Sequence, residues 1–318
     1  MSPHTRALGR AFALFLFTLV GVAACGTDFE PGSRVVDFRL LAVAADKPFA
    51  APGETVRLTT LHHEPFGRPL TWAWTTCPLP HDSTVNGCLA RLAELARTSA
   101  APPFTVEQGR SSFEVTIPPD ILDGIPEEAK GNAIVGVVTI VCPGNLSLKD
   151  LADIRSSQLP FRCIEAGTGV ELAYERYAVA VKRIYLYSRD KNQNPAIADV
   201  TWDGASWPEG EIKEARVCDF DSNSFEDCKG ERHEISVNAV PATAETGTSE
   251  YGTPFREDVV IQHYATEGVF EYDVKTLAQP KTRWAARARS RGQTITMWFV
   301  IRDNRGGVTW TSRQVRAL

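Results

Sequence analysis

Histidines beside acidic residues are the first groups in this sequence whose types suit chemistry. His62, His63 and Glu64 are consecutive, and His233 is followed directly by Glu234. Successive side chains of a strand point to opposite faces, so we expect His62 and His63 not to share a metal ion. The pair His233-Glu234 begins like the helix of a zinc protease, but no second histidine follows four residues on. Neither pair therefore predicts a metal site.

Motifs of known catalytic machinery are absent from the sequence. It contains no Gly-x-Ser-x-Gly elbow, no P-loop and no Gly-x-Gly-x-x-Gly fingerprint. Serine, histidine and aspartate residues that are far apart in the chain can still meet as a triad, because a triad is defined by geometry rather than by order. We therefore expect a protein that is not an enzyme, and a hydrolase with an unrecognised active site is an open alternative.

Oxygen-bearing side chains alternate after Cys218, at Asp219, Asp221 and Asn223, and Asp227 follows nearby. A tight loop with this pattern can wrap a calcium ion. A complete calcium hand also needs glycine at the sixth loop position and glutamate at the twelfth, and both are missing here. Two interpretations stay open, a loose calcium loop closed by a disulfide or a solvated acidic turn. No other cofactor is expected.

A group of basic residues without an intervening acid lies near the C-terminus, with a tryptophan among them. Such a group can bind anionic lipid headgroups or phosphorylated glycolipid, and the alternative is a solvated strand face. Nucleic acid is not an expected partner, because the chain has 34 basic against 39 acidic residues and a formal net charge of -5. The basic residues are Lys281, Arg283, Arg287, Arg289 and Arg291.

Residues 1–24 have the layout of an export signal. Residues 1–10 contain two arginines and no acid, residues 11–20 are apolar, and small residues follow before Cys25. The apolar stretch is shorter than the roughly 20 residues that a membrane span requires. The run Val22-Ala23-Ala24-Cys25 resembles the lipobox of bacterial lipoproteins.

The lipobox resemblance implies that the signal is cleaved before Cys25 and that this cysteine is acylated, with chains such as palmitate. Several acyl chains anchor a protein stably, so we expect a permanent membrane anchor and a short tether over residues 25–33. Gly26, in place of a retention aspartate, implies sorting to the outer membrane. The alternative is an ordinary signal peptide cut nearby, with Cys25 left as a thiol.

Six cysteines beyond Cys25, in a chain with an export signal, predict three disulfides. Pairing of sequence neighbours would close three local loops. The main alternative joins Cys77 to Cys142, because both end strands that are expected to be adjacent. The neighbour pairs are Cys77 with Cys88, Cys142 with Cys163, and Cys218 with Cys228.

The remaining chain has the pattern of an all-β protein. Its content of 43% hydrophobic and 23% charged residues is typical of a globular protein. Strand-like alternation separated by turn signals predicts two tandem immunoglobulin-like β-sandwiches, over residues 34–182 and 183–318. Helical leucine spacing predicts short helical insertions in the first sandwich, within residues 78–109 and 143–159, the second beginning at a capping box on Ser147. No Gly/Ser-rich linker separates the sandwiches, so we expect stiff coupling.

Three segments together resemble lipoproteins of myxobacterial type. They are the turn over residues 52–56, the dipeptide Asn194-Pro195 before a strand, and the run Trp-Phe-Val-Ile-Arg-Asp-Asn-Arg-Gly-Gly-Val-Thr-Trp over residues 298–310. The resemblance spans most of the chain and implies an envelope lipoprotein without implying an activity.

We therefore predict a non-enzymatic interaction or structural module, whose partner is another envelope protein or a glycan. A glycan-binding alternative predicts that some of the seven tryptophans form an exposed, flat strip. The hydrolase alternative predicts a concave pocket that holds a perturbed histidine beside serine or aspartate.

Overall fold

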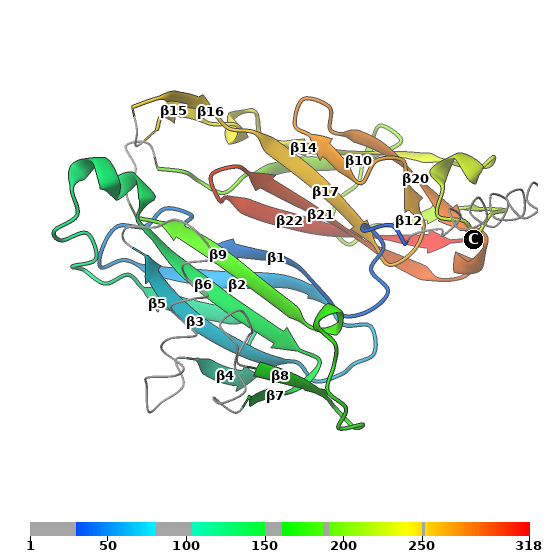
Figure 1. The fold of residues 1–318 in the computed structure, drawn as a ribbon. Helices are drawn as coiled ribbons and strands as arrows, with labels where there is room; N and C mark the ends of the chain where they lie inside the picture. Colours follow the sequence, from blue (N-terminus) through cyan, green and yellow to red (C-terminus); the bar gives the residue numbers. More distant parts are fainter. Residues whose placement is uncertain (1–29, 80–103, 150–160, 187–190, 250–251) are drawn as a thin grey trace, which may run out of the picture.

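The computed structural model describes residues 30–79, 104–149, 161–186, 191–249 and 252–318, and its regular structure consists of strands and short 3₁₀ turns (Figure 1). Residues 1–29, including Cys25, and Cys88 lie outside this part. Within it, no helix has the length and apolar content needed to cross a membrane. The strands form two sandwiches, which occupy the lower and upper halves of Figure 1.

The first sandwich packs a three-stranded sheet against a four-stranded sheet. Its second strand shows the alternation expected from the sequence, because Val56 and Leu58 are buried while Thr55 and Arg57 are exposed. The smaller sheet has the order β1 (Arg39–Ala45), β2 (Thr55–His63), β5 (Ser112–Thr116), and the larger has the order β4 (Thr105–Gln108), β3 (Thr71–Leu79), β6 (Ile134–Cys142), β9 (Ala178–Tyr185).

The second sandwich pairs a six-stranded with a five-stranded sheet. One sheet runs β11 (Ala205–Ser206), β10 (Ile197–Trp202), β14 (His233–Ala239), β20 (Lys281–Arg287), β13 (Val217–Cys218), with β18 (Val269–Phe270) also on β20; the other runs β12 (Ile212–Ala215), β22 (Val308–Ala317), β21 (Thr294–Asp303), β17 (Val259–Ala265), β19 (Val274–Thr276).

Both sandwiches have the immunoglobulin-like strand arrangement that the sequence predicts. In the first, strands one and two share a sheet with β5, while the third strand crosses to the sheet that holds β6 and the last strand. In the second, β10 pairs with β14 in one sheet, and between them the chain crosses to the other sheet, where β12 runs parallel to the last strand, β22. In both sandwiches the chain passes between two layers, which enclose the core from both sides.

Tryptophans fill both cores. Trp72 and Trp74 stack on one face of β3 in the first sandwich, with ring centroids 5.8 Å apart. Trp202, Trp207 and Trp284 meet in the second, where the Trp202 and Trp207 rings contact edge to face at 4.9 Å. Each ring buries a large apolar area, so these five side chains contribute much of the stability of the two sandwiches.

The segment after β6 corrects one helical expectation. Ser147, the expected helix cap, lies in β7 (Gly144–Leu148), which pairs antiparallel with β8 (Phe161–Glu165) and places Ser147 opposite Arg162. Residues 150–160 lie outside the described part, as do residues 80–103 of the first expected insertion. The capping pattern does not start a helix here, because pairing with β8 provides hydrogen-bond partners for the same backbone N–H and C=O groups.

Two of the neighbour disulfides are present. Cys142 at the end of β6 is bonded to Cys163 in β8, and Cys218 is bonded to Cys228. The alternative bond between Cys77 and Cys142 is therefore wrong. Short 3₁₀ turns complete the fold: η2 (Glu127–Asn132), η4 (Tyr174–Arg176), η5 (Phe225–Asp227), η6 (Pro241–Thr243) and η7 (Ala288–Ser290), together with the small hairpin β15 (Thr246–Thr248) and β16 (Pro254–Arg256).

Candidate functional site

The acidic loop and the basic run, expected as separate sites, lie against each other. The Arg287 guanidinium donates to Asn223 Oδ1 at 2.7 Å, and the backbone N–H of Arg289 donates to Asp221 Oδ1 at 3.2 Å. Arg287 is fully buried and also forms an ion pair with Glu267. Burial lowers the pKa of Arg287, and the neighbouring Glu267 carboxylate opposes that shift.

The other basic residues do not form a continuous cationic surface. Lys281 pairs with Glu234 at 2.8 Å, and Arg283 pairs with Glu271 at 2.6 Å. Arg291 donates to the backbone carbonyl of Leu318 at 3.2 Å. Because each of these cations has an oxygen partner, the field that an anionic ligand would meet is largely compensated.

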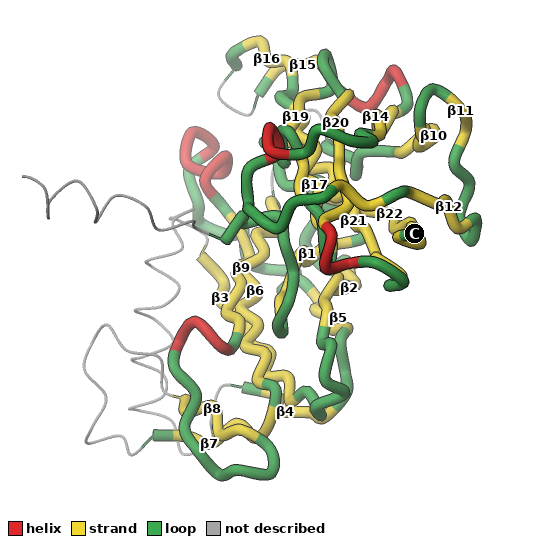
Figure 2. Tube along the Cα trace, turned by 90° about the vertical axis from the view of Figure 1, so that its right-hand side faces the viewer, coloured by secondary structure: helices red, strands yellow, loops and turns green. Residues whose placement is uncertain are grey.

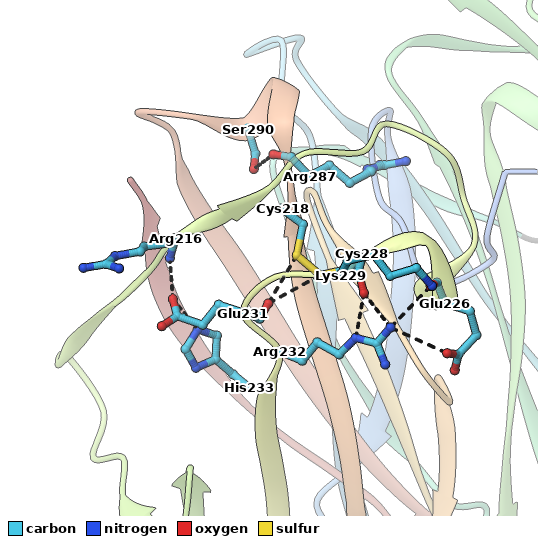
Figure 3. The surroundings of a disulfide bond; sticks show 10 residues. All are labelled: Arg216, Cys218, Glu226, Cys228, Lys229, Glu231, Arg232, His233, Arg287 and Ser290. Carbon is cyan, nitrogen blue, oxygen red and sulfur yellow. Dashed lines mark hydrogen bonds and ion pairs between the residues drawn. A yellow bond between two sulfur atoms is a disulfide. The ribbon is translucent and has the colours of Figure 1, made fainter.

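The loop between Cys218 and Cys228 is organised around its own backbone and its basic neighbours (Figure 3). Arg232 donates to the Cys228 carbonyl at 3.0 Å, and the Ser222 hydroxyl donates to Asp227 Oδ2 at 2.5 Å. Asp219 is exposed. In the described part of the chain, no group of three or more His, Cys, Asp or Glu side chains is placed to hold a metal ion. The side-chain oxygens of the loop thus accept hydrogen bonds from arginines and from groups within the loop itself.

The histidines lie as the strand pattern predicts. His62 contacts Trp72 in the core with ring centroids 5.2 Å apart, whereas His63 points to the opposite face and contacts Trp298 at 4.9 Å. Burial lowers the pKa of both histidines.

The third candidate histidine, His233, stacks on Trp202, and its Nδ1 lies 2.8 Å from Asp203 Oδ2. Among the hydrogen bonds of the described residues, none joins a serine hydroxyl to a histidine ring. A nucleophile–base pair of the serine-hydrolase type is therefore not assembled in this part of the chain.

The tryptophans do not provide a sugar-stacking strip. Six of them are buried, and Trp310 is half-buried. The exposed tryptophans that the glycan-binding alternative requires are therefore missing, because these rings serve the two cores and the contact between them. Among the described residues, the large exposed aromatic side chains are instead Phe66, Tyr174 and Tyr272.

The two sandwiches contact each other along an interface that we call the seam. On its apolar side, Ala42 and Ala44 of β1 pack against Val300 of β21 and Val308 of β22. A second cluster joins Leu41 with Trp298, and Val35 completes it. Strands β1 and β21 are each buried on both faces, since one face lies in its own core and the other lies in the seam.

Hydrogen bonds close the seam on both sides of these apolar contacts. The Arg302 guanidinium donates to the Leu41 carbonyl at 2.6 Å and to Gln262 Oε1 at 2.8 Å. The Asn194 side chain donates to the Ala45 carbonyl at 2.7 Å and accepts the backbone N–H of Val308 at 2.9 Å. Each of these two side chains therefore joins the sandwiches directly, and the burial of Arg302 lowers its pKa.

The turn between β21 and β22 is shaped to enter the seam. Asp303 Oδ1 accepts the backbone N–H groups of Arg305 at 2.8 Å and Gly307 at 2.7 Å. A Cβ on Gly307 would lie 2.8 Å from the Gln193 carbonyl oxygen, so only glycine fits there. The Lys182 amine, which projects from β9, donates to the carbonyl of Gly306. Burial lowers the pKa of Lys182 to about 8.

An aromatic clamp holds the next side chain of the turn. The Arg305 guanidinium lies 4.9 Å from the ring centroid of Phe49 in the first sandwich and 4.1 Å from that of Phe255 in the second. It also pairs with Glu257 at 3.4 Å. Glu257 is buried, and this burial raises the pKa of its carboxyl to about 7.

A cavity of about 430 Å³ lies between β1, β9 and the β21–β22 turn, lined by Leu41, Val43, Lys182, Tyr185, Arg302 and Gly306 among others. Its volume is in the range of small-ligand pockets. Its two main cationic groups already donate across the seam, to Gly306 and to Leu41. Neither a serine nor a histidine is among its lining residues.

The seam was not predicted from the sequence, although one strand pattern indicates it. The strand over residues 294–303 carries Trp298 and Val300 on the face opposite its core residues, which indicates a second packing partner. The three segments that carry the lipoprotein resemblance also converge here, since Asn194 bonds to Val308, Pro195 abuts Gly307, and Glu54 lines an adjoining recess with Phe49.

Neither a family model nor a curated protein matches this sequence. Among solved structures, the chain is similar to red sea bream transglutaminase, with a TM-score of 0.25 and 9% identity over 90% of this chain and 32% of that one. It is similar to the D0-D1 domain of intimin, with a TM-score of 0.21 and 9% identity over 87% and 98%.

A third similar structure comprises the three N-terminal domains of the bacteriophage RB49 outer capsid protein Hoc, with a TM-score of 0.19 and 11% identity over 88% of this chain and 59% of that one. The chain thus spans about a third of the transglutaminase and under two thirds of the Hoc fragment. The fold assignment rests on the sheet topology of the chain itself.

Proposed function

We propose that this protein is an outer-membrane lipoprotein, anchored through acylated Cys25, that acts as a rigid, non-enzymatic interaction module of the cell envelope. Its partner in this proposal is another envelope protein. The two sandwiches hold binding loops at a fixed distance from the lipid anchor and at a fixed angle to it.

The seam is the observation that supports this proposal. Domains within one chain usually move relative to each other unless their interface is extensive and apolar. Here an apolar contact between β1 and β21 is closed by hydrogen bonds from Arg302 and Asn194. A module whose loops keep a fixed geometry loses less conformational entropy on binding, so such rigidity favours recognition.

The chemistry of the described residues agrees with a non-enzymatic role. Two groups with strongly shifted pKa values, Lys182 and Glu257, lie in the seam and are engaged there with Gly306 and Arg305. A third, His263, is buried in the core of the second sandwich beside Phe270 and Phe299, and this burial lowers its pKa to about 4. A binding function uses this arrangement, because it holds the two sandwiches together without requiring any reacting group.

The experiment is mild cross-linking in intact cells of the native host, followed by purification through a C-terminal tag and mass spectrometry. A Cys25→Ala variant serves as the matched control, because it should be exported without its lipid. We expect one envelope protein to co-purify stoichiometrically with the wild type and to decrease in the control. Enrichment of glycan alone, or of no partner, would contradict the interaction role.

A further inference from the structure

One end of the first sandwich carries exposed apolar side chains close to Asp37, near the N-terminal end of the described chain. Phe66 is 64% exposed, Tyr174 is 60% exposed and Val170 is 59% exposed. They come from the β2–β3 connection and the β8–β9 connection, which in immunoglobulin-like domains lie at the same end. Figure 2 looks at this end of the molecule, with β7 and β8 in the lower half of the view.

A cluster of ion pairs holds these side chains together. The Arg68 guanidinium donates to Asp37 Oδ1 at 2.5 Å and lies 4.9 Å from the Phe66 ring centroid. Arg176, in the same turn as Tyr174, lies 3.5 Å from Glu165. Arg68 also pairs with Glu64 at 2.5 Å, so both arginines are engaged by carboxylates and acids outnumber cations in the cluster. The apolar rim can therefore leave water without exposing an unpaired cation to lipid.

The described chain begins beside the second sandwich, where the Val35 N–H donates to the Ala265 carbonyl at 2.9 Å, and reaches this end of the first sandwich at Asp37. Gly32 accepts a hydrogen bond from Arg39 at 2.5 Å, and Arg39 pairs with His63 at the edge of β1 and β2. Asp37 belongs to the ion-pair cluster itself. Between Cys25 and Glu30 the chain has five Cα–Cα steps, which span at most about 18 Å. A lipid on Cys25 would therefore keep the bilayer near the segment that leads to Asp37, which pairs with Arg68 beside Phe66.

We propose that this end of the first sandwich docks on the lipid bilayer, with Phe66 and Tyr174 inserted into the headgroup region. The inference rests on the proposed lipid anchor. Aromatic side chains favour the membrane interface, where an apolar ring and a polar end are both accommodated. The tether makes the contact intramolecular, so even a small apolar surface is sufficient for docking.

Charge indicates which bilayer this surface fits. Burial raises the pKa of Tyr177, and the nearby Tyr174, Glu171 and Glu175 raise it further. These two acids flank the docking surface, so anionic lipids should not strengthen the contact. Docking should therefore occur on zwitterionic phosphatidylcholine and should not weaken when salt is raised.

The test uses a Phe66→Trp variant of the full lipid-modified protein, reconstituted in phosphatidylcholine vesicles with brominated acyl chains. The native tryptophans are buried or half-buried, so they give a constant background. The matched control is Val240→Trp, because Val240 is 37% exposed and its N–H bonds to Ala196, near the opposite end of the seam. We expect the lipid bromines to quench the introduced tryptophan at least about twofold more in the Phe66→Trp variant than in the control, at low and high salt alike.

Equal quenching of the two variants, in protein that carries its acyl chains and floats with the vesicles, would overturn the docking and leave the anchor intact. Loss of quenching at about 0.5 M salt would also overturn it, because an apolar contact is not screened. Absence of acyl mass on Cys25 would overturn the anchor, and the docking inferred from it would fail as well.

Discussion

The basic residues along β20 and those at the seam play different roles, although both sets are rich in charge. Four of the five basic residues of the run over 281–291 are exposed, and their partners are surface oxygens. At the seam, Lys182 is buried, and Arg302 and Arg305 are half-buried between the sandwiches. Most basic residues that are clustered in the sequence therefore lie on a solvated face. The basic residues at the seam, in contrast, are far apart in the sequence and join the two sandwiches.

Arg287 is the exception within the basic run and should give the largest effect. It is fully buried and paired with Glu267, so Arg287→Ala would leave that carboxylate partly buried without its main partner. We expect a loss of about 3 to 5 kcal/mol in the free energy of unfolding of the second sandwich. Urea denaturation of wild type and variant measures it. A loss below about 1 kcal/mol would place Arg287 with its exposed neighbours.

Glu257 should make the seam sensitive to pH. Its folded pKa of about 7 lies above the ordinary value of 4.5, so the folded state binds the extra proton and stability falls as pH rises from about 4.5 to 7. Glu257→Gln should remove this slope and be about 2 to 3 kcal/mol more stable than wild type at pH 8. Thermal unfolding from pH 5 to 8 measures the difference. Parallel pH profiles of the two proteins would contradict this.

Lys182 should make the stability depend on pH in a higher pH range, and here the stability should rise with pH instead of falling. Its folded pKa of about 8 lies below the ordinary value of 10.5, so its charge costs stability below pH 8. That cost, about 2 to 3 kcal/mol, is relieved as pH rises from 8 to 10.5. Lys182→Met should show no such rise relative to wild type. Denaturation at pH 7 and pH 10 tests it, and an unchanged slope in the variant would refute the burial of the amine.

Gly307→Ala should loosen the seam by a smaller amount. The added methyl group would lie 2.8 Å from the Gln193 carbonyl oxygen and from Pro195 Cδ, so backbone must shift. Overpacking of this kind costs about 1 to 3 kcal/mol. Gly32→Ala is the matched control, because nothing lies within 4 Å of its added Cβ. Similar unfolding midpoints for the two variants would argue against a tight fit at the turn.

Lys281→Ala should give the smallest effect. Its side chain is 65% exposed and its partner Glu234 is 41% exposed, so the pair is surrounded by water. We expect a change below about 0.5 kcal/mol in the free energy of unfolding. Comparison with Arg287→Ala shows how much more a buried cation contributes to the free energy of unfolding than an exposed cation of the same strand. A large loss at Lys281 would remove the distinction between the two regions.

Local patterns predicted the features that depend on neighbours in sequence. Alternation predicted the sandwich strands and placed His62 and His63 on opposite faces. Pairing of cysteines that are neighbours in sequence predicted the disulfides Cys142–Cys163 and Cys218–Cys228. These features follow from the two-residue period of a strand and from short loop closure.

Features that depend on distant segments could not be predicted in the same way. Ser147 lies in a strand, although its sequence pattern is that of a helix cap. Arg287 is buried, although it belongs to a run of basic residues that indicates a solvent-exposed face. The seam joins Leu41 to Arg302, which are 261 residues apart. A contact between residues so far apart leaves no periodic pattern in the sequence around either of them. Only the second apolar face of the strand over 294–303 indicated that another surface covers it.

The most direct test of the rigid module is small-angle X-ray scattering of residues 30–318 with and without Val300→Asp. Val300 is fully buried at the seam, so an aspartate there places an unpaired charge between the sandwiches. We expect the wild type to scatter as one body with a fixed arrangement of the two sandwiches, and the variant to show a larger radius of gyration and maximum dimension. Wild-type data that require a range of domain orientations would contradict the rigid seam.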